Sequence, residues 1–383
     1  MTKKRRILFL NHSAVLGGGE LCLIDLAQTY QELSQVLLLS HGDLSEKLRN
    51  LGIKFRVLPA PEQVLSIRAS STWESLKAVS SLWQIAGEIA SFSQNFEIIH
   101  ANSQKAFIVA ALARLRGSPP VVWHLRDILT ASHFSRVNCK VATTLANRYA
   151  TQVIVNSQAT GEAFVQVGGN PQLVNVVYDG ICPESFMARI SKTPNEIRQE
   201  LGLINLPLIG VFSRLSYWKG QHILLEAVKQ LPEVHVLIVG DALFGETDYV
   251  NQIKSLIELP ELQGRVHWLG FRDDIPSLMQ ACDLIVHPST APEPFGRVII
   301  EAQLAQKPII ASATGGAVEL IEDGCNGRLF PAGDTGALAE IIQTLLTDTV
   351  LSSKLAQQGA IQARQKFSLE QSLRNFDAVL DKV

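Results

Sequence analysis

The stretch ILFLNHSAVLGGGELCLIDLAQTY, residues 7–30, carries the pattern that decides the fold. Its apolar run Ile7–Leu10 predicts a short buried strand, and Glu20–Tyr30 has the spacing of an amphipathic helix. A glycine-rich loop separates the two. Strand, loop and helix in this order form the first half of a βαβ unit, which indicates a parallel sheet covered by helices.

The loop contains Gly17, Gly18 and Gly19. Glycines let a backbone approach a phosphate or a sugar closely, and the start of the next helix favours anions; a tight turn explains these glycines equally well. The spacing is not GxGxxG, and the second predicted strand, Val36–Leu39, does not lead into an acidic residue. A dinucleotide-dependent dehydrogenase is therefore weakened and stays an alternative on fold alone.

Short apolar runs alternate with helical stretches along the chain and predict two series of strands. The first series is Ile7–Leu10, Val36–Leu39, Phe55–Leu58, Ile98–His100, Val121–His124, Val153–Asn156 and Val174–Tyr178. The second is Leu208–Phe212, Val234–Val239, Val266–Leu269, Leu284–His287, Pro308–Ala311 and Gly327–Phe330. We expect two Rossmann-like, doubly wound α/β domains that face a central cleft.

With 383 residues, the chain is too long for one ordinary core. We assign the first domain to residues 1–180 and the second to residues 195–366. Between them, Asp179–Asn195 contains two prolines and little periodicity, so we interpret it as the interdomain linker. The final helix, about residues 367–383, has no strand after it and is expected to pack back on the first domain.

The composition excludes several classes of protein. A net charge of −2 gives no general attraction to nucleic acid or to an anionic membrane. The five cysteines are scattered without a CxxC pair, which is typical of a reducing compartment. No apolar run approaches the roughly 20 residues of a membrane helix, and the N-terminal run is too short for a signal peptide. We therefore expect a cytoplasmic protein and leave peripheral membrane contact open.

Two segments keep two interpretations each. The polar stretch Leu129–Lys140 either lines an acceptor site or is an ordinary loop. A helical stripe of apolar side chains either packs in the core or touches a bilayer; its members are Trp73, Leu76, Val79, Trp83 and Ala86.

The run EPFGRVIIE places Glu293 in a proline-broken loop and Glu301 within the following helix. Unpaired amides at a helix start attract an anion, while nearby carboxylates can hold hydroxyl groups. This combination suits a sugar joined to a nucleotide. Acidic residues near a helix start are also favoured by the helix dipole alone.

Arg214 and Lys219 follow the first strand of the second domain, in FSRLSYWKG. Two cations in one strand-end loop can neutralise a diphosphate that leaves with negative charge, although a solvated basic loop is the simpler alternative. No DxD sequence occurs in the chain. We therefore expect side-chain cations to hold the diphosphate, with no metal and no other cofactor required.

His124 ends a strand in VVWHLRD and can contact a substrate hydroxyl, or it can simply pack. Arg126 and Asp127 beside it are weaker candidates. Three other histidines at strand ends are interpreted as mainly structural, namely His12, His100 and His287.

Together these residues resemble glycosyltransferase family 4, the retaining enzymes of the GT-B fold, over nearly the whole chain. The matching motifs are Gly17–Gly19, His124, Asn156-Ser157, Arg214 with Lys219, Glu293 with Glu301, Gly315–Glu319 and Asp323–Gly327. The resemblance departs at Ser213, where the family often has glycine, at Arg297, usually apolar, and at Asp179, usually asparagine. These departures weaken the assignment of donor and acceptor without removing a required charge.

The resemblance implies roles for individual residues. The catalytic set would be His124 near the C6 side of the donor sugar, Arg214 and Lys219 on the diphosphate, and Glu293 on sugar hydroxyls. Phe271 and Arg272 would lie near the base and Glu301 on the ribose. The remaining donor-binding residues would be Gly17, Gly18, Gly19, Phe295, Gly296, Arg297 and Val298.

We therefore expect a retaining hexosyltransferase that uses a UDP-sugar, with glucose or a related hexose, and a carbohydrate or lipid-linked acceptor, in polysaccharide synthesis. A GDP-mannose-dependent mannosyltransferase and a non-catalytic nucleotide-sugar-binding protein are alternatives. A sugar epimerase or a phosphorylase of the same fold also remains open.

Overall fold

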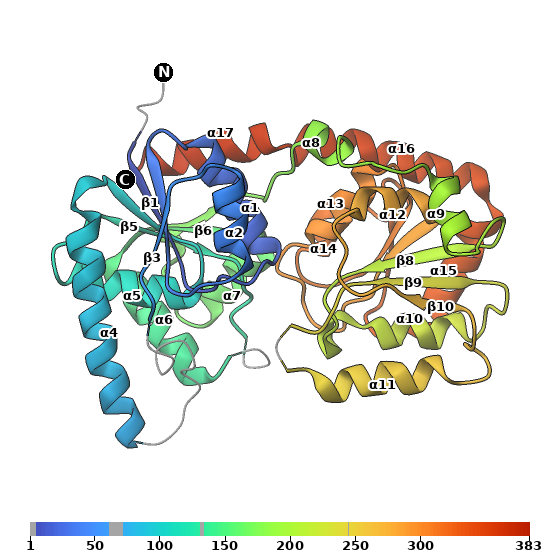
Figure 1. Ribbon diagram of the computed structural model, residues 1–383, viewed down its shortest axis with the longest axis horizontal. Helices are drawn as coiled ribbons and strands as arrows, with labels where there is room; N and C mark the ends of the chain where they lie inside the picture. The colour runs from blue at the N-terminus through green and yellow to red at the C-terminus, as the bar shows by residue number, and fades with distance from the viewer. Residues whose placement is uncertain (1–4, 61–71, 131–133, 244) are drawn as a thin grey trace. The chain divides into compact units, whose positions relative to one another are not determined.

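The computed structural model describes residues 5–60, 72–130, 134–243 and 245–383, and Figure 1 shows its helices and strands. The chain divides into two compact units, each of which makes most of its contacts within itself. Unit 1 comprises Met1–Asp179 and Ser372–Val383, and unit 2 comprises Gly180–Gln371. Each unit is built on its own parallel sheet.

Unit 1 has a seven-stranded sheet in the order β3-β2-β1-β4-β5-β6-β7, with every pair parallel. Its strands are β1 Ile7–Asn11, β2 Ser34–Leu38, β3 Phe55–Val57, β4 Ile98–Ala101, β5 Val121–Leu125, β6 Ala150–Val155 and β7 Val174–Val176. Its helices are α1 Gly18–Thr29, α2 Asp43–Asn50, α4 Thr72–Phe92, η1 Ser93–Asn95, α5 Gln104–Arg114, α6 Arg136–Tyr149, α7 Gln158–Gln166 and η2 Pro171–Leu173.

Strand β1 shows why this sheet is buried on both faces. Ile7 and Phe9 belong to the apolar cluster that contains α1 and α2, whereas Leu8 and Leu10 belong to the cluster that contains α4 and α5. Successive side chains of a strand point to opposite faces, so a strand covered by helices on both sides must be apolar throughout. This explains why the short apolar runs predict the strands so well.

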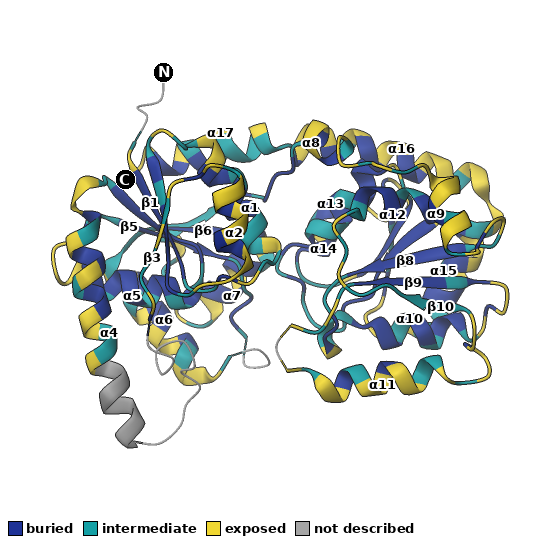
Figure 2. Ribbon diagram, in the orientation of Figure 1, coloured by how far each residue is buried: buried dark blue, intermediate teal, exposed yellow. Residues whose placement is uncertain are grey.

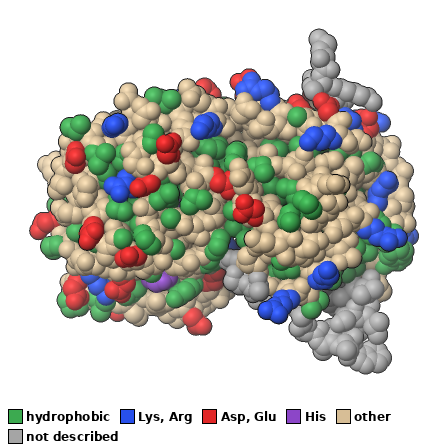
Figure 3. All heavy atoms as spheres, turned by 180° about the vertical axis from the view of Figure 1, so that it is seen from behind, with side chains coloured by type: hydrophobic (Ala, Val, Ile, Leu, Met, Phe, Trp, Pro, Cys, Tyr) green, Lys and Arg blue, Asp and Glu red, His purple; other side chains and the backbone are tan. Residues whose placement is uncertain are grey.

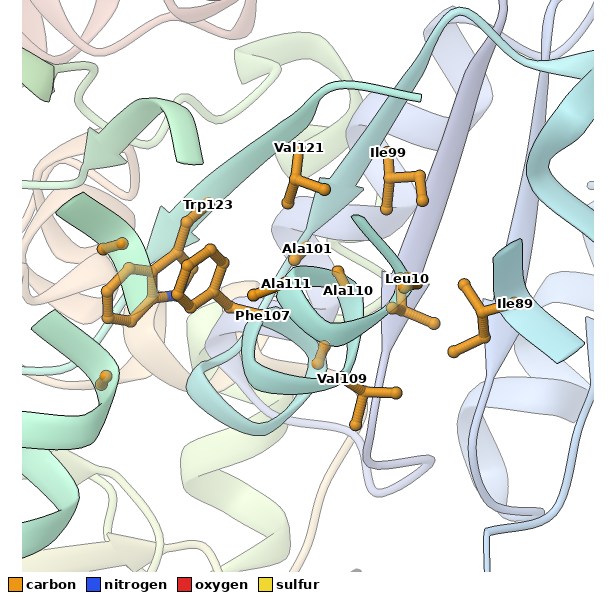
Figure 4. Packing of buried hydrophobic residues seen from close by; sticks show 14 of the residues in the cluster. Leu10, Ile89, Ile99, Ala101, Phe107, Val109, Ala110, Ala111, Val121 and Trp123 are labelled. Carbon is orange, nitrogen blue, oxygen red and sulfur yellow. The ribbon is translucent and has the colours of Figure 1, made fainter. Parts of the chain in front are cut away.

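Buried apolar side chains, among them Phe107 and Trp123, fill the α5 side of the sheet, as Figure 4 shows. The rings of Phe107 on α5 and Trp123 on β5 stack with centroids 4.4 Å apart. Phe164 of α7 meets the same indole edge-on at 5.9 Å. These fully buried rings fix α5 and α7 against the strand that carries His124.

Unit 2 has a six-stranded parallel sheet in the order β10-β9-β8-β11-β12-β13. Its strands are β8 Leu208–Phe212, β9 His235–Val239, β10 Val266–Trp268, β11 Leu284–His287, β12 Ile309–Ser312 and β13 Arg328–Phe330. Its helices are α8 Pro183–Met187, α9 Pro194–Glu200, η3 Tyr217–Lys219, α10 Gln221–Val228, α11 Thr247–Ile257, α12 Ile275–Ala281, α13 Arg297–Leu304, α14 Ala317–Leu320, α15 Thr335–Thr347 and α16 Thr349–Lys366.

Burial in unit 2 follows the same rule, and its central strands are the dark blue elements of Figure 2. Ile209 and Val211 of β8 pack against Leu224 and Leu225 of α10, in a cluster that α11 and α15 complete. In each sheet the next two strands of the sequence lie on one side of the first strand, and the later strands lie on its other side, as in doubly wound sheets. The predicted fold class of two Rossmann-like domains is therefore confirmed.

The predicted elements are present, with shifted ends in a few places. Strand β6 begins at Ala150 rather than at Val153. Within the polar stretch Leu129–Lys140, α6 begins at Arg136, because the hydroxyl of Ser135 accepts a bond from the amide of Asn138 and caps the helix. That stretch is therefore partly helical, and residues 131–133 lie outside the described part of the chain.

The segment Asp179–Asn195 was interpreted as irregular, which is wrong in part. Helix α8 lies within it, and α9 begins at its end. Pro183 and Pro194 occupy the first turns of these helices, where the missing N–H of proline has no partner to lose. The prolines thus mark two helix starts.

The last helix, α17 (Leu369–Leu380), packs its final turns on the α1 side of the unit 1 sheet. Phe376 is buried against the rings of Tyr30 and His100, and the Tyr30 hydroxyl donates to Asp377. Unit 1 is therefore completed by residues that follow all of unit 2 in the sequence.

The apolar stripe expected on one helix falls on α4. Ala86 is buried in the core of unit 1, whereas Trp83 is 46% exposed and lies 5.0 Å from the guanidinium of Arg116. The side chains of Trp73, Leu76 and Val79 lie outside the described residues. No helix in the described ranges combines the length and apolar character needed to cross a bilayer. Bilayer contact through α4 stays a prediction.

The surface carries both signs of charge. On the face drawn in Figure 3, basic and acidic side chains are dispersed among uncharged ones. This agrees with the net charge of −2.

Replacing Phe376 by alanine should lower the free energy of unfolding of unit 1 by about 3–5 kcal/mol, because a cavity replaces a fully packed ring. Hydrogen exchange followed by mass spectrometry would then show faster exchange in β1 and β4, and unchanged exchange in β8 and β9. Val350→Ala is the control, since Val350 is 80% exposed. Unchanged protection of β1 in the Phe376 variant would contradict the assignment of α17 to this core.

Candidate active site

Lys219 and Glu293 form a buried ion pair in unit 2. Lys219 ends η3, after β8, and its Nζ lies 2.7 Å from Oε2 of Glu293, which is only 7% exposed. Both side chains come from loops that follow the carboxyl ends of parallel strands, where ligands bind in open α/β sheets. Two residues predicted to be catalytic are thus in direct contact.

Three donors converge on the same carboxylate oxygen. Besides Lys219, His287 Nε2 lies 2.9 Å and Ser289 Oγ 3.1 Å from Glu293 Oε2. Burial alone would raise the pKa of Glu293, but the nearby Lys219 ammonium and the His287 bond hold it far below its ordinary value. Glu293 is therefore an anion at neutral pH. His287, which we had interpreted as mainly structural, orients this carboxylate.

The two cations of this loop lie close together. Burial lowers the pKa of Lys219, Glu293 opposes that effect, and the positive charge of Arg214 lowers it further. Trp218 lies between them in sequence, with Lys219 Nζ 4.0 Å and the Arg214 guanidinium carbon 5.7 Å from its ring centroid. The predicted cation pair is therefore assembled on one indole ring.

Glycines allow the loop of Glu293 to be packed from both sides. Gly220 (φ +73°) faces the carbonyl of Pro288, and Gly315 (φ +59°) faces the backbone of Glu293, so a Cβ at either position would clash. The amide of Gly316 donates to the carbonyl of Glu293 at 2.6 Å. The two glycines of the TGG sequence therefore hold the Glu293 loop in place.

Helix α13 follows this loop and presents the second glutamate. Gly296 is its N-cap with φ +98°, Phe295 before it is buried, and Val298 is half-buried in the first turn. Glu301 lies one turn after Arg297, and its Oε1 is 3.2 Å from Nε of that arginine. The arginine that departs from the family pattern thus contacts the carboxylate expected to bind a ribose.

The two residues expected near the base differ in their surroundings. Phe271, in the loop after β10, is 63% exposed. Arg272 makes two bonds to the carboxylate of Asp274, at 2.8 and 2.6 Å. An exposed aromatic ring can stack on a planar base, whereas this guanidinium is already engaged by a neighbour.

His124 occupies the predicted position at the end of β5 in unit 1, but it is buried. Its Nδ1 lies 3.1 Å from Nε2 of His100 and 3.3 Å from Nη2 of Arg126. Burial, Arg126 and His100 all lower the pKa of His124, so its imidazole is neutral at pH 7. Burial and Arg126 lower the pKa of His100 to about 3. His124 is thus suited to hydrogen bonding.

Arg126 connects the other unit 1 residues. It donates from Nε to Asn102 at 2.9 Å and from Nη1 to Asp179 at 2.5 Å, and both charged side chains are buried. Asp179 is the position where the family usually has asparagine. The substitution is explained by this ion pair, because a buried guanidinium needs a counter-charge.

The glycine loop lies beside Arg126. Gly17 is the N-cap of α1, and a Cβ on Gly19 would lie 3.0 Å from Cδ of Arg126. A Cβ on Gly18 would meet nothing within 4 Å. Gly19 therefore packs closely against Arg126, whereas Gly18 has open space around it that a ligand could approach.

Several residues that contact the candidate site residues were not singled out or were rated lower from the sequence. Ser289 and Asn102 were not singled out, and Arg126 was rated below His124. The available signal was position, since these residues follow the carboxyl ends of β11, β4 and β5. In the described part of the chain, no group of three His, Cys, Asp or Glu side chains could hold a metal ion.

Two family models match the chain. A model described as Glycosyl transferase 4-like domain matches residues 17–180, and one described as Glycosyl transferases group 1 matches residues 194–365. The crystal structure of Anabaena Alr3699/HepE in complex with UDP-glucose has 41% sequence identity and a TM-score of 0.89, and the match covers 99% of this chain and 100% of that chain.

Curated relatives are similar over shorter stretches. Spore coat protein SA of Bacillus subtilis is 32% identical over 218 residues, which cover 54% of this chain and 58% of that protein. The lipopolysaccharide core biosynthesis glycosyltransferase LpsE of Rhizobium meliloti is 30% identical over 164 residues, which cover 43% of this chain and 46% of that protein. The chain thus spans about half the length of these relatives.

Glu293→Gln should lower the free energy of unfolding of unit 2 by about 3–5 kcal/mol, because Lys219 stays buried without a counter-charge. The double variant Lys219→Met, Glu293→Gln should lose less than the sum of the single variants. Urea denaturation of the four proteins measures this coupling. Additive losses would contradict a buried pair.

The coupling should also depend on pH. Because the pKa of Glu293 is depressed in the folded protein, its contribution is fully present above the ordinary value of 4.5 and declines as pH falls below it. The stability difference between the native protein and the double variant should therefore shrink in acid.

Proposed function

Because this chain belongs to the family 4-like glycosyltransferases of the GT-B fold, we propose that it transfers a hexose from a UDP-sugar to a hydroxyl of a carbohydrate or lipid-linked acceptor. The observation that carries the proposal is the cluster of Arg214, Lys219 and Glu293 at the carboxyl end of the unit 2 sheet. It combines two cations for a diphosphate with a carboxylate for sugar hydroxyls.

UDP-glucose is the preferred donor in this proposal. HepE, which matches nearly the whole chain at 41% identity, has been crystallised with UDP-glucose. A uracil base would stack on exposed Phe271, and Glu301 on α13 would accept bonds from the ribose. The acceptor would enter from unit 1, with Gly18 beside the donor and His124 near the C6 side of the donor sugar.

The geometry also supports separate roles for the two oxygens of Glu293. Oε2 accepts hydrogen bonds from Lys219, His287 and Ser289, while Oε1 has no hydrogen-bond partner among the described residues. Oε1 would therefore accept a hydrogen bond from a donor-sugar hydroxyl. Lys219, held beside Arg214, would contact the phosphate oxygen on which charge builds up as the bond to the sugar breaks.

We propose that transfer proceeds with retention and without a metal. The acceptor oxygen forms a bond to the anomeric carbon on the face that the diphosphate leaves, and the acceptor proton passes to the departing phosphate oxygen. This route needs no nucleophile from the protein. Fixed cations would take the place of a divalent ion, in line with the absence of DxD from the sequence.

A GDP-mannose-dependent enzyme is the second candidate, and a binding protein without transfer is the third. LpsE, a relative named for lipopolysaccharide core biosynthesis, favours a role in polysaccharide assembly. The acceptor would then be a growing saccharide, which can be lipid-linked and bring the enzyme to a membrane surface.

Incubation with UDP-glucose and a panel of saccharide acceptors should release UDP and form an α-linked product, identified by NMR of the anomeric proton. Rates should be equal with and without EDTA. UDP-glucose should raise the melting temperature more than GDP-mannose or ADP-glucose, because a ligand of the native state stabilises it. Binding without turnover would favour the non-catalytic alternative. A β-linked product or revival by Mg²⁺ would refute the proposed mechanism.

Arg214→Ala should lower kcat by about 100- to 1000-fold, which is typical for loss of one preorganised donor to a developing anion. Arg214 is the sharper test, because Lys219→Ala also leaves Glu293 buried without its counter-charge. Lys229→Ala, on the surface of unit 2, is the matched control, and Arg214→Lys should restore part of the rate. Native turnover by Arg214→Ala would contradict this role.

A further inference from the structure

The hydrogen bonds around His124 determine which of its ring nitrogens carries the proton. A guanidinium only donates hydrogen bonds. Since Arg126 Nη2 lies 3.3 Å from Nδ1 of His124, that nitrogen must be the acceptor. A neutral imidazole with an accepting Nδ1 carries its hydrogen on Nε2.

His100 is consistent with this assignment. Its Nε2 lies 3.1 Å from the same Nδ1 of His124 and must then donate, which leaves Nδ1 of His100 unprotonated. In the opposite tautomer, the Nδ1 hydrogen of His124 could bond to Nε2 of His100, but the Nη2 donor of Arg126 would then face an N–H and lose its acceptor. Burial and the positive charge of Arg126 lower the pKa of both histidines. Both rings are therefore neutral near pH 7, and each carries one hydrogen, on either Nδ1 or Nε2.

Arg126 is held in place by three independent contacts. Asp179 neutralises its charge, Asn102 accepts from Nε, and Gly19 leaves space for its side chain. Asn102 in turn donates to the carbonyl of Gly19 at 3.2 Å. The guanidinium therefore cannot turn away from His124 without breaking a buried ion pair.

The other ring nitrogen of His124, Nε2, then carries a hydrogen that can be donated to a ligand. Among the described residues, Nε2 of His124 is buried and has no hydrogen-bond partner. A buried N–H without a partner is costly, so such a group marks a position where a ligand can supply the acceptor.

We propose that Arg126 is a positioning residue that fixes His124 as the Nε2–H tautomer, so that His124 donates a hydrogen bond to a hydroxyl or ether oxygen of a sugar substrate. The identity of that substrate rests on the function proposed above. The tautomer does not, because it follows from the contacts of unit 1 alone.

The tautomer can be observed without any substrate. In ¹⁵N NMR spectra of histidine-labelled protein, with His124 assigned by comparison with His124→Gln, the Nδ1 signal should fall in the unprotonated range and Nε2 in the protonated range near neutral pH. Arg126→Lys keeps a cation beside Asp179 but cannot reach all three partners, so His124 should then show a mixture of tautomers. A protonated Nδ1 in the native protein, or an unchanged spectrum in Arg126→Lys, would overturn the proposal.

Kinetics test whether the tautomer matters for transfer. Arg126→Lys should lower kcat/KM for UDP-glucose by about 10- to 100-fold, the usual value of one directed hydrogen bond. The His124→Gln variant has no imidazole and therefore no tautomer for Arg126 to fix. In the His124→Gln background, Arg126→Lys should therefore have almost no further effect. An equal loss in both backgrounds would show a merely structural role and overturn the proposal.

Arg116→Lys, an exposed arginine of unit 1, controls for general effects of the substitution. If the native protein transfers no sugar, the proposed function fails while the NMR measurement still decides the tautomer. If transfer occurs but the spectrum shows the opposite tautomer, only the role of Arg126 fails.

Discussion

A charge removed from water must be paired, and this constraint determines the arrangement at the carboxyl end of each sheet. In unit 2 the pair is Lys219 with Glu293, and in unit 1 it is Arg126 with Asp179. Neither partner can be removed alone without leaving an uncompensated buried charge. The glycines, histidines and short helices around each pair are arranged so that these four side chains keep their positions.

The two pairs serve different purposes. Three donors converge on Oε2 of Glu293, which fixes the carboxylate that we propose to bind a sugar hydroxyl through its other oxygen. Asp179 neutralises a cation whose remaining donors orient His124 and Asn102. Unit 2 thus gathers two cations and a carboxylate, whereas the ion pair of unit 1 lies beside a buried, neutral imidazole.

Most of the fold could be predicted from the sequence because both sheets are covered on both faces. Runs such as Ile7–Leu10 are apolar at every position, which only a fully buried strand requires. The linker was in error where one residue type has two uses: Pro183 and Pro194 were counted as part of an irregular segment, yet they begin helices. Proline does both, and the sequence alone does not distinguish them.

The sequence indicated where the residues of the candidate site lie along the chain, but not which of them contact one another. Strand-end location identified His124, Lys219 and Glu293, since carboxyl ends of parallel strands collect ligand-binding residues. The contact between Lys219 and Glu293 joins residues 74 positions apart, and Arg126 meets Asp179 across 53. Such pairs depend on strand order and on loop packing, which periodicity does not reveal.

The return of α17 to unit 1 has a consequence for biosynthesis. Phe376 and its neighbours complete a core whose first strand is Ile7–Asn11, yet they are translated only after the whole of unit 2. Unit 1 therefore cannot complete its core before the whole of unit 2 has been synthesised. The usual order, in which an N-terminal domain folds before the next domain is made, is not available to this chain. Until its last helix arrives, nascent unit 1 exposes an apolar sheet face that chaperones would recognise.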